Sequence, residues 1–295
     1  MPELPEVETV RRILEPQLKE RRISDLTVNR PEIIAHPTED VFTHAVIGSV
    51  IVRMGRRGKY LSLHLDNGNT ILLHLRMTGQ LLATPAEFPA EKHTHLIFHL
   101  DDGTELRFLD TRRFGRFWLL QKNEEDIWSG VRKLGPEPDS FDPQLTPAWL
   151  REKIGRSRRP VKECLLDQHT VAGIGNIYGD EILFAAKICP ARPACSLKDP
   201  EWQTLAAVIP AVLQKAVEDN RMTLEEYLEG RGKEYRNDPF LQVYGHEGDA
   251  CPCCGAALKR IVLSGRSSVY CANCQPEQRH SEKKEKNRRD AARRR

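Results

Sequence analysis

Four cysteines near the end of the chain have the spacing of a metal site. Cys251 and Cys254 form one C-x2-C pair, Cys271 and Cys274 form a second, and sixteen residues separate the two pairs. Each pair wraps a turn so that two thiolates face one ion, and four protein ligands leave no position open for water or substrate. We therefore expect one structural Zn²⁺ that holds the intervening hairpin, whose tip is at Gly265.

Two other interpretations of these cysteines stay open. Cys253 lies between two of the expected ligands and is an alternative to one of them, although its spacing from Cys251 fits the turn less well. Alternatively, the four cysteines are reduced surface thiols without a metal.

The other cysteines show no partner spacing, which is typical of small buried side chains. These are Cys164, Cys189 and Cys195.

The beginning of the chain offers a different chemistry. Pro2 follows Met1, and removal of Met1 would leave a secondary amine at the chain end. An α-amino group has a pKa near 8, roughly two units below that of lysine, so a useful fraction is a neutral nucleophile at neutral pH. Such an amine condenses with an aldehyde-level carbon to an iminium, which acidifies the neighbouring C–H bond. Glu3 and Lys59 are candidates for the proton transfers if the fold brings them close. The alternative is a purely structural proline at the start of a helix.

The composition fits a two-domain protein of the cytoplasm. The 295 residues are 39% hydrophobic and 29% charged, enough to bury an ordinary core in each of two domains. No window approaches the roughly 18 apolar residues of a membrane span, and the first residues lack the basic flank and apolar stretch of a secretion signal. We therefore expect a cytoplasmic protein without a membrane partner. We also expect it to be a monomer.

The formal net charge of +3 is unevenly distributed. Residues 276–295 carry nine Lys or Arg against four acidic residues, so this tail contributes +5 and the rest of the chain −2. A basic surface for nucleic acid must then be local, and MGRRGKY, DTRRFGR and GRSRRPVK are the candidate segments. The tail has almost no apolar residues, which predicts disorder and a role either as an electrostatic tether to DNA or as an inert extension.

Hydrophobic periodicity predicts a helix followed by a β-rich part. Apolar residues recur at three- and four-residue steps from Glu3 to Leu18, as in an amphipathic helix. Short runs that alternate apolar and polar residues follow, separated by turn pairs such as Asn67-Gly68 and Asp102-Gly103, and indicate a β-sandwich to about residue 130. These runs are VIGSVIVRM, KYLSLHL, TILLHL, THLIFHL, TELRFLD and GRFWLL.

The second half of the chain is expected to be mainly helical, which makes the fold class α+β. Thr146-Pro147 and Asp199-Pro200 each start a helix, and the preceding LGPEPDSFDP concentrates Pro, Gly and Asp as a linker does. The expected divisions are an N-terminal β-sandwich domain at 1–133, a linker at 134–143, a helical domain at 144–245, a zinc ribbon at 246–275 and a disordered basic tail at 276–295.

Five separated motifs occur in an order and spacing that resemble the formamidopyrimidine-DNA glycosylase family. They are MPELPEVETV, HLRMTG, DTRRFG, GIGNIYGDE and the four-cysteine ribbon, and the match spans nearly the whole chain to Cys274. The resemblance implies a helix–two-turn–helix DNA-binding element in the helical domain. Its implied partner is double-stranded DNA that contains an oxidised base, with association to the nucleoid when DNA is bound. The implied activity is that of a DNA glycosylase and AP lyase of base excision repair, which excises 8-oxoguanine and formamidopyrimidines and cleaves the strand by β,δ-elimination.

The resemblance assigns four catalytic residues. Pro2 attacks the sugar C1′ after Met1 is lost, Glu3 protonates during base release and ring opening, and Lys59 assists β-elimination. Arg266, at the ribbon tip, binds the phosphate beside the lesion and assists δ-elimination. The zinc ion then acts indirectly, because it holds the loop that aims Arg266.

The resemblance also assigns residues that contact DNA. An enzyme that acts on a base within a duplex everts the nucleotide and fills the gap that it leaves. Met77, Arg112 and Phe114 match the side chains that fill this gap, as an apolar wedge, a donor to the opposite base and an aromatic plate. Three further positions match DNA contacts, and these are His93, Lys162 and Asn176. The ordinary alternatives are strand-end packing, a strand histidine and a solvated lysine.

One segment departs from the family pattern and leaves the lesion preference open. EGRGKEYRNDPFLQVYG stands where the family has a Gly-rich loop over the everted base, and Arg231, Lys233, Arg236 and Asp238 add charge to it. Leu4, where an endonuclease VIII-like enzyme usually has Gly, favours purines, as does Met77 together with the RRF sequence. The alternatives are an endonuclease VIII-like glycosylase for oxidised pyrimidines and a non-catalytic zinc-ribbon DNA-binding protein.

Overall fold

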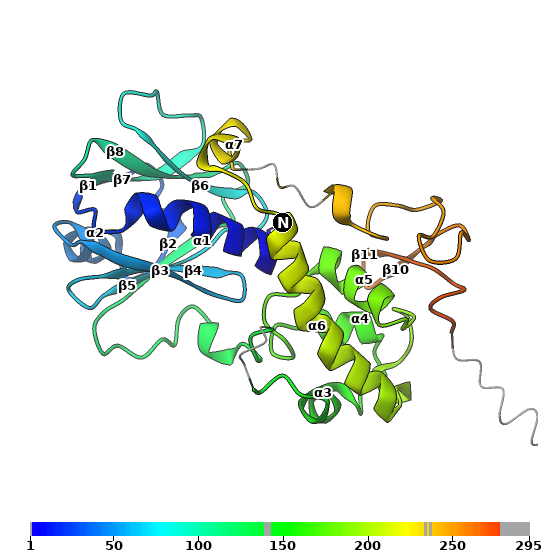
Figure 1. Ribbon diagram of the computed structural model, residues 1–295. Coiled ribbons are helices and arrows are strands. Elements are labelled where there is room, and N and C mark those ends of the chain that lie inside the picture. Colours follow the sequence, from blue (N-terminus) through cyan, green and yellow to red (C-terminus); the bar gives the residue numbers. More distant parts are fainter. Residues whose placement is uncertain (1, 139–142, 233–234, 236–237, 278–295) are drawn as a thin grey trace, which may run out of the picture. The chain divides into compact units, whose positions relative to one another are not determined.

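The computed structural model describes residues 2–138, 143–232, 235 and 238–277, which form two compact units (Figure 1). The first unit comprises the chain up to Leu145, Asp167–Gly175 and Pro210–Phe240. The second comprises Thr146–Leu166, Asn176–Ile209 and the chain from Leu241. The units interleave along the sequence, and the contiguous domain limits expected above remain a proposal. Met1 and the tail residues 278–295 lie outside the described residues.

The first unit begins with helix α1 (Leu4–Leu18), which confirms the predicted N-terminal helix. Pro5 lies in its first turn, where a missing N–H costs no helical hydrogen bond. Glu3 and Glu6 form a capping box, in which the Glu6 carboxylate accepts the Glu3 backbone N–H at 2.8 Å. The predicted apolar stripe faces the core, and its buried members include Val7, Val10, Leu14 and Leu18.

Two sheets form the body of this unit. One has the order β1 (Ile23–Val28), β7 (Thr94–Leu100), β8 (Thr104–Asp110) and β6 (Gly79–Pro85), and neighbouring strands are antiparallel. The other has the order β2 (Ile34–His36), β9 (Arg116–Leu120), β5 (Thr70–His74), β4 (Tyr60–Leu65) and β3 (Ile51–Arg57), and only β2 with β9 is parallel. Side chains from both sheets and from α1 share one hydrophobic core, so the unit is the predicted β-sandwich with a helix packed on β3, β4 and β6.

Five of the six predicted strand runs correspond to β4, β5, β7, β8 and β9. The prediction for VIGSVIVRM was wrong in its first half. Helix α2 (Glu39–Val46) ends there, and Gly48, with φ 84°, turns the chain before β3 starts. Strand β6 was not predicted, because its sequence GQLLATP does not alternate apolar and polar residues.

The second unit is helical with a small hairpin, as predicted. Its helices are α3 (Pro147–Ile154), α4 (Val161–Leu166), α5 (Asn176–Ala185) and the first half of α6 (Asp199–Asp219), and its hairpin pairs β10 (Lys259–Leu263) with β11 (Arg266–Tyr270). Thr146 caps α3 by accepting the Trp149 N–H at 3.1 Å. Helix α7 (Leu224–Glu229) belongs to the first unit. Among the described helices, none combines the length and apolar character needed to cross a bilayer.

Candidate functional site

Glu3 and Leu4, close to the N-terminus, pack against the loop Asp167–Gly175 of the first unit. Leu4 N–H donates to the Gly173 carbonyl at 3.1 Å, and Gly175 N–H donates to the Glu3 carboxylate at 2.8 Å. A Cβ on Gly175 would lie 2.3 Å from the carboxyl carbon of Glu3, so only glycine allows this approach. Glu3 is 2% exposed and Pro2 is also buried. The backbone of this loop therefore holds the carboxylate of Glu3, the residue that follows Pro2, in one position.

The same loop receives the turn that carries Lys59. Gly58, with φ 54°, lies between β3 and β4, and a Cβ on it would lie 3.3 Å from both Ala172 Cβ and Gly173 N. Lys59 follows it and is 6% exposed. The loop is thus a common neighbour of Glu3 and of the Gly58–Lys59 turn, which brings two of the predicted catalytic residues to one part of the unit.

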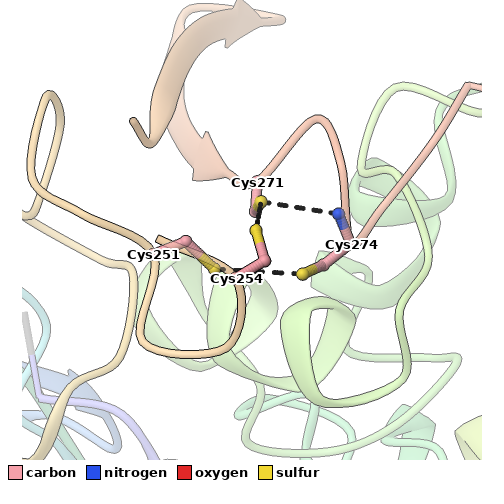
Figure 2. A group of neighbouring side chains, drawn as sticks. All are labelled: Cys251, Cys254, Cys271 and Cys274. Atoms are coloured by element: carbon pink, nitrogen blue, oxygen red, sulfur yellow. Dashed lines mark hydrogen bonds between the residues drawn. The ribbon is translucent and has the colours of Figure 1, made fainter. Parts of the chain in front are cut away.

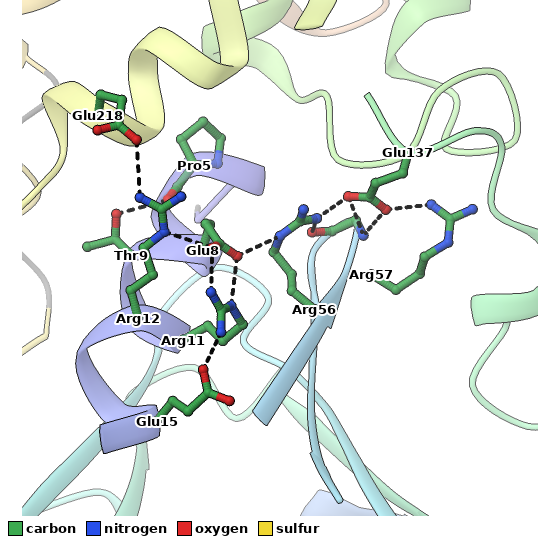
Figure 3. A network of polar contacts seen from close by, with 11 residues as sticks. Pro5, Glu8, Thr9, Arg11, Arg12, Glu15, Arg56, Arg57, Glu137 and Glu218 are labelled. Carbon is green, nitrogen blue, oxygen red and sulfur yellow. Dashed lines mark hydrogen bonds and ion pairs between the residues drawn. The ribbon is translucent and has the colours of Figure 1, made fainter. Parts of the chain in front are cut away.

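Glu137 also holds this turn (Figure 3). Its carboxylate accepts the Gly58 N–H at 3.0 Å and the Arg57 guanidinium at 2.6 Å, and it also pairs with Arg56. Arg57 donates further to the carbonyl of Leu134 at 3.3 Å. Three donors from the turn therefore converge on one carboxylate of the predicted linker.

Glu8 extends this ion network to α1 (Figure 3). Its carboxylate accepts Arg56 at 3.2 Å, Arg11 at 2.8 Å and Arg12 at 2.9 Å. Burial by itself would raise the pKa of Glu8, but the hydrogen bonds and charges of these three arginines outweigh burial and lower the pKa from 4.5 to about 2. Glu8 is therefore ionised at neutral pH, and charged hydrogen bonds join the helix after Pro2 to the strand before Lys59.

His74 is a buried residue beside this turn that the sequence prediction missed. It lies opposite Tyr60 in the β4–β5 pair, and the two rings meet edge to face at 4.6 Å. Burial, together with the positive charges of Arg76 and Lys59, lowers the pKa of His74 from 6.5 to about 3. Its Nδ1 accepts the Arg76 N–H at 2.9 Å, which assigns the proton of the neutral ring to Nε2. The signal in the sequence was its place in HLRMTG, the motif that also contains Met77.

The three predicted gap-filling residues contact one another on the first unit. The Arg112 guanidinium lies 4.7 Å from the centre of the Phe114 ring and 3.1 Å from the sulfur of Met77. Met77 and Phe114 are each 45% exposed, although both are large apolar side chains. Strand-end packing in the core, the ordinary alternative, is therefore excluded for both, and the cluster is accessible to a partner.

Asp110, which is fully buried, shapes the loop under this cluster. Its carboxylate accepts the backbone N–H of Gly115 at 2.7 Å, the N–H of Arg112 at 3.2 Å and the hydroxyl of Thr78. A Cβ on Gly115 would lie 2.4 Å from the ring of Phe108, so the loop needs glycine at this point. These contacts tie the HLRMTG and DTRRFG motifs together.

His93 is exposed and lines a cavity of about 430 Å³ in the first unit. Its φ of 72° places it before β7 rather than within the strand. Arg30, Lys92 and Arg113 line the same cavity, and their positive charges suit an anion such as a phosphate. The neighbouring His95 is a buried strand residue whose Nε2 bonds the Asp110 carbonyl at 2.7 Å.

Asn176 and Lys162 lie in the second unit, in different surroundings. Asn176 is the first residue of α5, and its Oδ1 is buried without a hydrogen-bond partner among the described residues.

Lys162, on α4, is 1% exposed, and its ammonium lies 2.7 Å from the Asp180 carboxylate. Burial raises the pKa of Asp180, while the Lys162 charge and the hydrogen bonds of Asp180 oppose that rise. Lys162 is thus not the solvated lysine of the ordinary alternative, and its DNA contact stays a prediction.

The four predicted zinc ligands form one cluster (Figure 2). Their Sγ atoms all lie within 4.8 Å of one another, with 3.9 Å between Cys251 and Cys274 and 3.5 Å between Cys254 and Cys271. Tetrahedral Zn–S bonds of about 2.3 Å require S–S separations of about 3.8 Å, so the donor set fits zinc. Cys253 is exposed and not part of the cluster. The site is therefore a structural zinc site with four cysteine ligands, in which bound zinc would hold the thiolates together.

The hairpin above the zinc site presents Arg266. Ser264 and Gly265 form its two-residue turn with φ of 45° and 78°, and Arg266 opens β11 with an exposed side chain. Glu181 on α5 accepts the backbone N–H groups of residues 242–244, each at 2.9 Å, and so anchors the segment that enters the ribbon. The sequence prediction identified Arg266 but not this anchoring carboxylate.

Comparison with known proteins agrees with this arrangement. Residues 1–117 match the model of the formamidopyrimidine-DNA glycosylase N-terminal domain, residues 134–227 match the H2TH domain of the same enzyme, and residues 248–276 match a zinc finger found in FPG and IleRS. The chain is 44% identical over 276 residues to the formamidopyrimidine-DNA glycosylase of Desulforamulus reducens, covering 93% of this chain and 99% of that protein. It is 46% identical over 261 residues to that of Moorella thermoacetica, covering 88% and 94%.

Solved structures of the Lactococcus lactis Fpg match over almost the whole chain. Its complex with DNA containing Fapy-dG has a TM-score of 0.85 at 33% identity and covers 93% of this chain and all of that chain. Its complex with DNA containing an oxidised pyrimidine matches equally well, at 34% identity. The chain therefore belongs to the formamidopyrimidine-DNA glycosylase family: it is a DNA glycosylase of base excision repair, from a family whose members also act as AP lyases.

Proposed function

We propose that this glycosylase excises 8-oxoguanine and formamidopyrimidines from double-stranded DNA, with the amine of Pro2 as the nucleophile, and then cleaves the strand by β,δ-elimination. The observation that carries the proposal is the packing of Glu3 and of the Gly58–Lys59 turn against the loop Ala172–Gly175. This packing brings the Glu3 carboxylate and the backbone turn that carries Lys59 to one loop next to the chain end, which supports proton transfer by these two residues around an iminium.

The first half of the reaction is base release. After Met1 is removed, the Pro2 nitrogen uses its lone pair to form a bond to C1′, and the glycosidic bond breaks with its electrons going to the base, which is protonated. The Pro2 nitrogen then loses its proton to the Glu3 carboxylate, and Glu3 returns a proton to the ring oxygen O4′, so that the C1′–O4′ bond breaks, the sugar opens and a cationic iminium joins Pro2 to C1′. The hydrogen bond from Gly175 N–H keeps the Glu3 carboxylate in one position for this transfer.

The second half is strand cleavage. The iminium acidifies the C2′–H bond, a proton leaves C2′, and the C3′–O bond breaks with its electrons going to the phosphate. Lys59 assists this β-elimination as acid or base. Loss of a C4′ proton then expels the second phosphate from C5′, with Arg266 binding the phosphate, and water releases the amine. A gap flanked by two phosphates remains.

Contacts with DNA are proposed at six residues in the two units. Mutual contact and exposure of Met77, Arg112 and Phe114 support insertion of this cluster into the duplex. The basic cavity at His93 and the unpaired oxygen of Asn176, whose amide can also present its N–H group, support phosphate contacts. The sixth residue is Lys162. Because its side chain is buried, an indirect effect on DNA binding is better supported than a direct contact with a phosphate.

Oxidised pyrimidines are a second substrate candidate. The Lactococcus lactis protein has been solved with DNA containing Fapy-dG and with DNA containing an oxidised pyrimidine. We expect this chain to process 8-oxoguanine opposite cytosine faster than thymine glycol, because it has Leu4 and the Met77 cluster. A faster reaction on thymine glycol in single-turnover excision would contradict the assignment.

Borohydride trapping tests the nucleophile. The purified chain, with its processed N-terminus verified by mass spectrometry, is mixed with 8-oxoguanine duplex and reduced. We expect a covalent protein–DNA adduct whose modified peptide begins at Pro2, and a matched Lys59→Met variant that still forms it. An adduct located on a lysine, or no adduct with active protein, would overturn the proposal of a proline Schiff base.

A further inference from the structure

The four zinc ligands lie at one end of the ribbon hairpin and Arg266 lies at the other. Arg266 opens β11 and the first ligand after it is Cys271, so the two are five positions apart, about 16 Å of chain. A two-stranded hairpin with no other element packed against it is only marginally stable. The zinc ion fixes the base of the hairpin, and a different contact is needed to fix its tip.

One such contact lies two residues before Arg266. The Ser264 hydroxyl, in the turn, donates to the Glu163 carboxylate of α4 at 2.6 Å. Ser264 has a φ of 45°, a conformation that a non-glycine residue rarely adopts without a supporting contact. Glu163 is mostly buried, with 15% of its side chain exposed, which strengthens this charged hydrogen bond relative to a fully solvated one.

A second set of contacts lies directly after Arg266. The Lys162 ammonium donates to the Ser267 carbonyl at 3.1 Å and to the Ser268 hydroxyl at 3.2 Å. Asp180 of α5 accepts the same Ser268 hydroxyl and also the Val269 N–H at 3.0 Å. Lys162 and Asp180 therefore form one buried ion pair, and this pair binds three consecutive residues of β11, Ser267 to Val269.

We propose that Lys162, Glu163 and Asp180 form a tip clamp, a metal-independent set of positioning residues that aims Arg266 at its phosphate. The inference rests on the proposed role of Arg266 in strand cleavage. The tip clamp brackets Arg266, with Glu163 on Ser264 and the Lys162–Asp180 pair on Ser267 to Val269. It accounts for a buried lysine at a position that matches a DNA contact, because Lys162 acts on DNA through the backbone next to Arg266.

Ser264→Ala is the central test, because it removes the Glu163 contact at an exposed turn and spares the buried pair. Single-turnover cleavage of duplex containing an abasic site is measured for Ser264→Ala, Arg266→Ala and the double variant, each with its zinc content determined. We expect Ser264→Ala to lower the maximal rate roughly tenfold with zinc fully retained, since small misplacements of a catalytic group cost tenfold or more. In the Arg266→Ala background the same substitution should change the rate by less than about twofold, because its effect passes through Arg266.

Two further variants complete the design. Glu247→Gln alters another carboxylate of the ribbon, which pairs with Arg260 at 3.7 Å away from the tip, and should cleave at the wild-type rate. Asp180→Asn should reproduce Ser264→Ala if it retains zinc. Equal losses from Ser264→Ala in both backgrounds, or a wild-type rate for Ser264→Ala, would overturn the tip clamp while leaving the proposed function intact. A wild-type rate for Arg266→Ala would instead remove Arg266 from the proposed function, and the tip clamp with it.

Discussion

Gly175 leaves room for the Glu3 carboxylate that a single methyl group would occupy. Its φ is not positive, so alanine fits the backbone, but the new Cβ would lie 2.3 Å from the carboxyl carbon of Glu3. We expect Gly175→Ala to displace that carboxylate and slow base excision by about 100-fold or more, the contribution of a positioned acid. Single-turnover excision of 8-oxoguanine measures this, with thermal unfolding as the control for folding.

The Glu3→Gln substitution provides the matched test of that argument. If Gly175 acts by placing Glu3, then Glu3→Gln should slow the wild type strongly and the Gly175→Ala variant only slightly. Full and additive losses in the double variant would show that Gly175 matters for another reason.

The neutral state of His74 makes stability depend on pH. Its pKa is about 3 in the folded chain against 6.5 when exposed, so the unfolded chain binds the additional proton in the interval between. Stability is therefore complete above pH 6.5 and falls as the pH drops toward 3. Between pH 6.5 and 5 we expect the wild type to lose about 1.5 kcal/mol of unfolding free energy through this group. Urea unfolding should show that the His74→Asn variant loses less unfolding free energy over this pH interval. The control is His44→Asn, at an exposed helix position, which should lose as much as the wild type.

Single residues also show how far the sequence predicts the site. The cysteine spacing gave the complete ligand cluster, because ligands close in sequence must surround one ion. Glu137 and Asp180 were not predicted, because each accepts backbone N–H groups distant in sequence. Asp110 was not predicted either, although its backbone donors Arg112 and Gly115 follow it closely in the chain. An isolated carboxylate in a sequence does not reveal that it will be buried on such donors.

Between elements, the Glu8–Arg56–Glu137 network joins α1 to the β3–β4 turn (Figure 3). Glu137→Ala would leave two guanidinium groups and the Gly58 N–H without this acceptor in a mostly buried place. Removing one partner of a buried ion pair costs roughly 3–5 kcal/mol, and partial exposure here reduces our expectation to about 2–3 kcal/mol. Denaturant unfolding measures the loss, and slower strand cleavage should accompany it if the turn also carries Lys59 out of place.

Glu218→Gln is the control within the same network. Glu218 pairs with Arg12, but both side chains are more than 40% exposed, and exposed pairs contribute little. We expect its unfolding free energy to stay within about 0.5 kcal/mol of the wild type. A loss as large as that of Glu137→Ala would mean that the network stabilises the fold as a whole rather than through the turn.

The elements themselves were predictable where apolar and polar residues recur in the sequence at a regular period, although burial in the strands is more continuous than that pattern. Helix α1 has a single apolar stripe, and β4 and β7 correspond to alternating runs. In the long helix α6 the start was predicted, but the sequence did not show which of its apolar residues would face the core: Leu205, Ile209 and Leu213 are buried, whereas Val208 and Val212 are only partly buried. Several apolar residues in one helix fit more than one stripe, and only tertiary packing decides among them.

For the molecule as a whole, the zinc ligands and the large hydrophobic core lie in different units. The four cysteines and the ribbon core with Val243 and Leu258 lie in the second unit, whereas the large hydrophobic core lies in the first. We expect chelation to release one zinc ion per chain, to abolish cleavage of abasic-site DNA and to leave most β-sheet circular dichroism unchanged. Restoration of cleavage by added Zn²⁺ is the control, and full activity of verified zinc-free protein would contradict the structural role of the site.

The charge of the whole chain predicts how its DNA affinity depends on salt. Residues 278–295 carry nine basic and three acidic side chains, so their removal leaves a net charge of −3. Each phosphate contact made by the tail contributes about 0.9 to the slope of log K against log salt concentration. We expect truncation after Glu277 to make this slope shallower by about 3 or more, and to weaken binding strongly at low salt but little at high salt. A tail of the same length with its nine basic residues replaced by glutamine should behave like the truncation, because charge rather than length attracts the phosphates. An unchanged slope in both variants would identify the tail as an inert extension, and the local basic groups of the folded units would then account for the whole electrostatic part of binding.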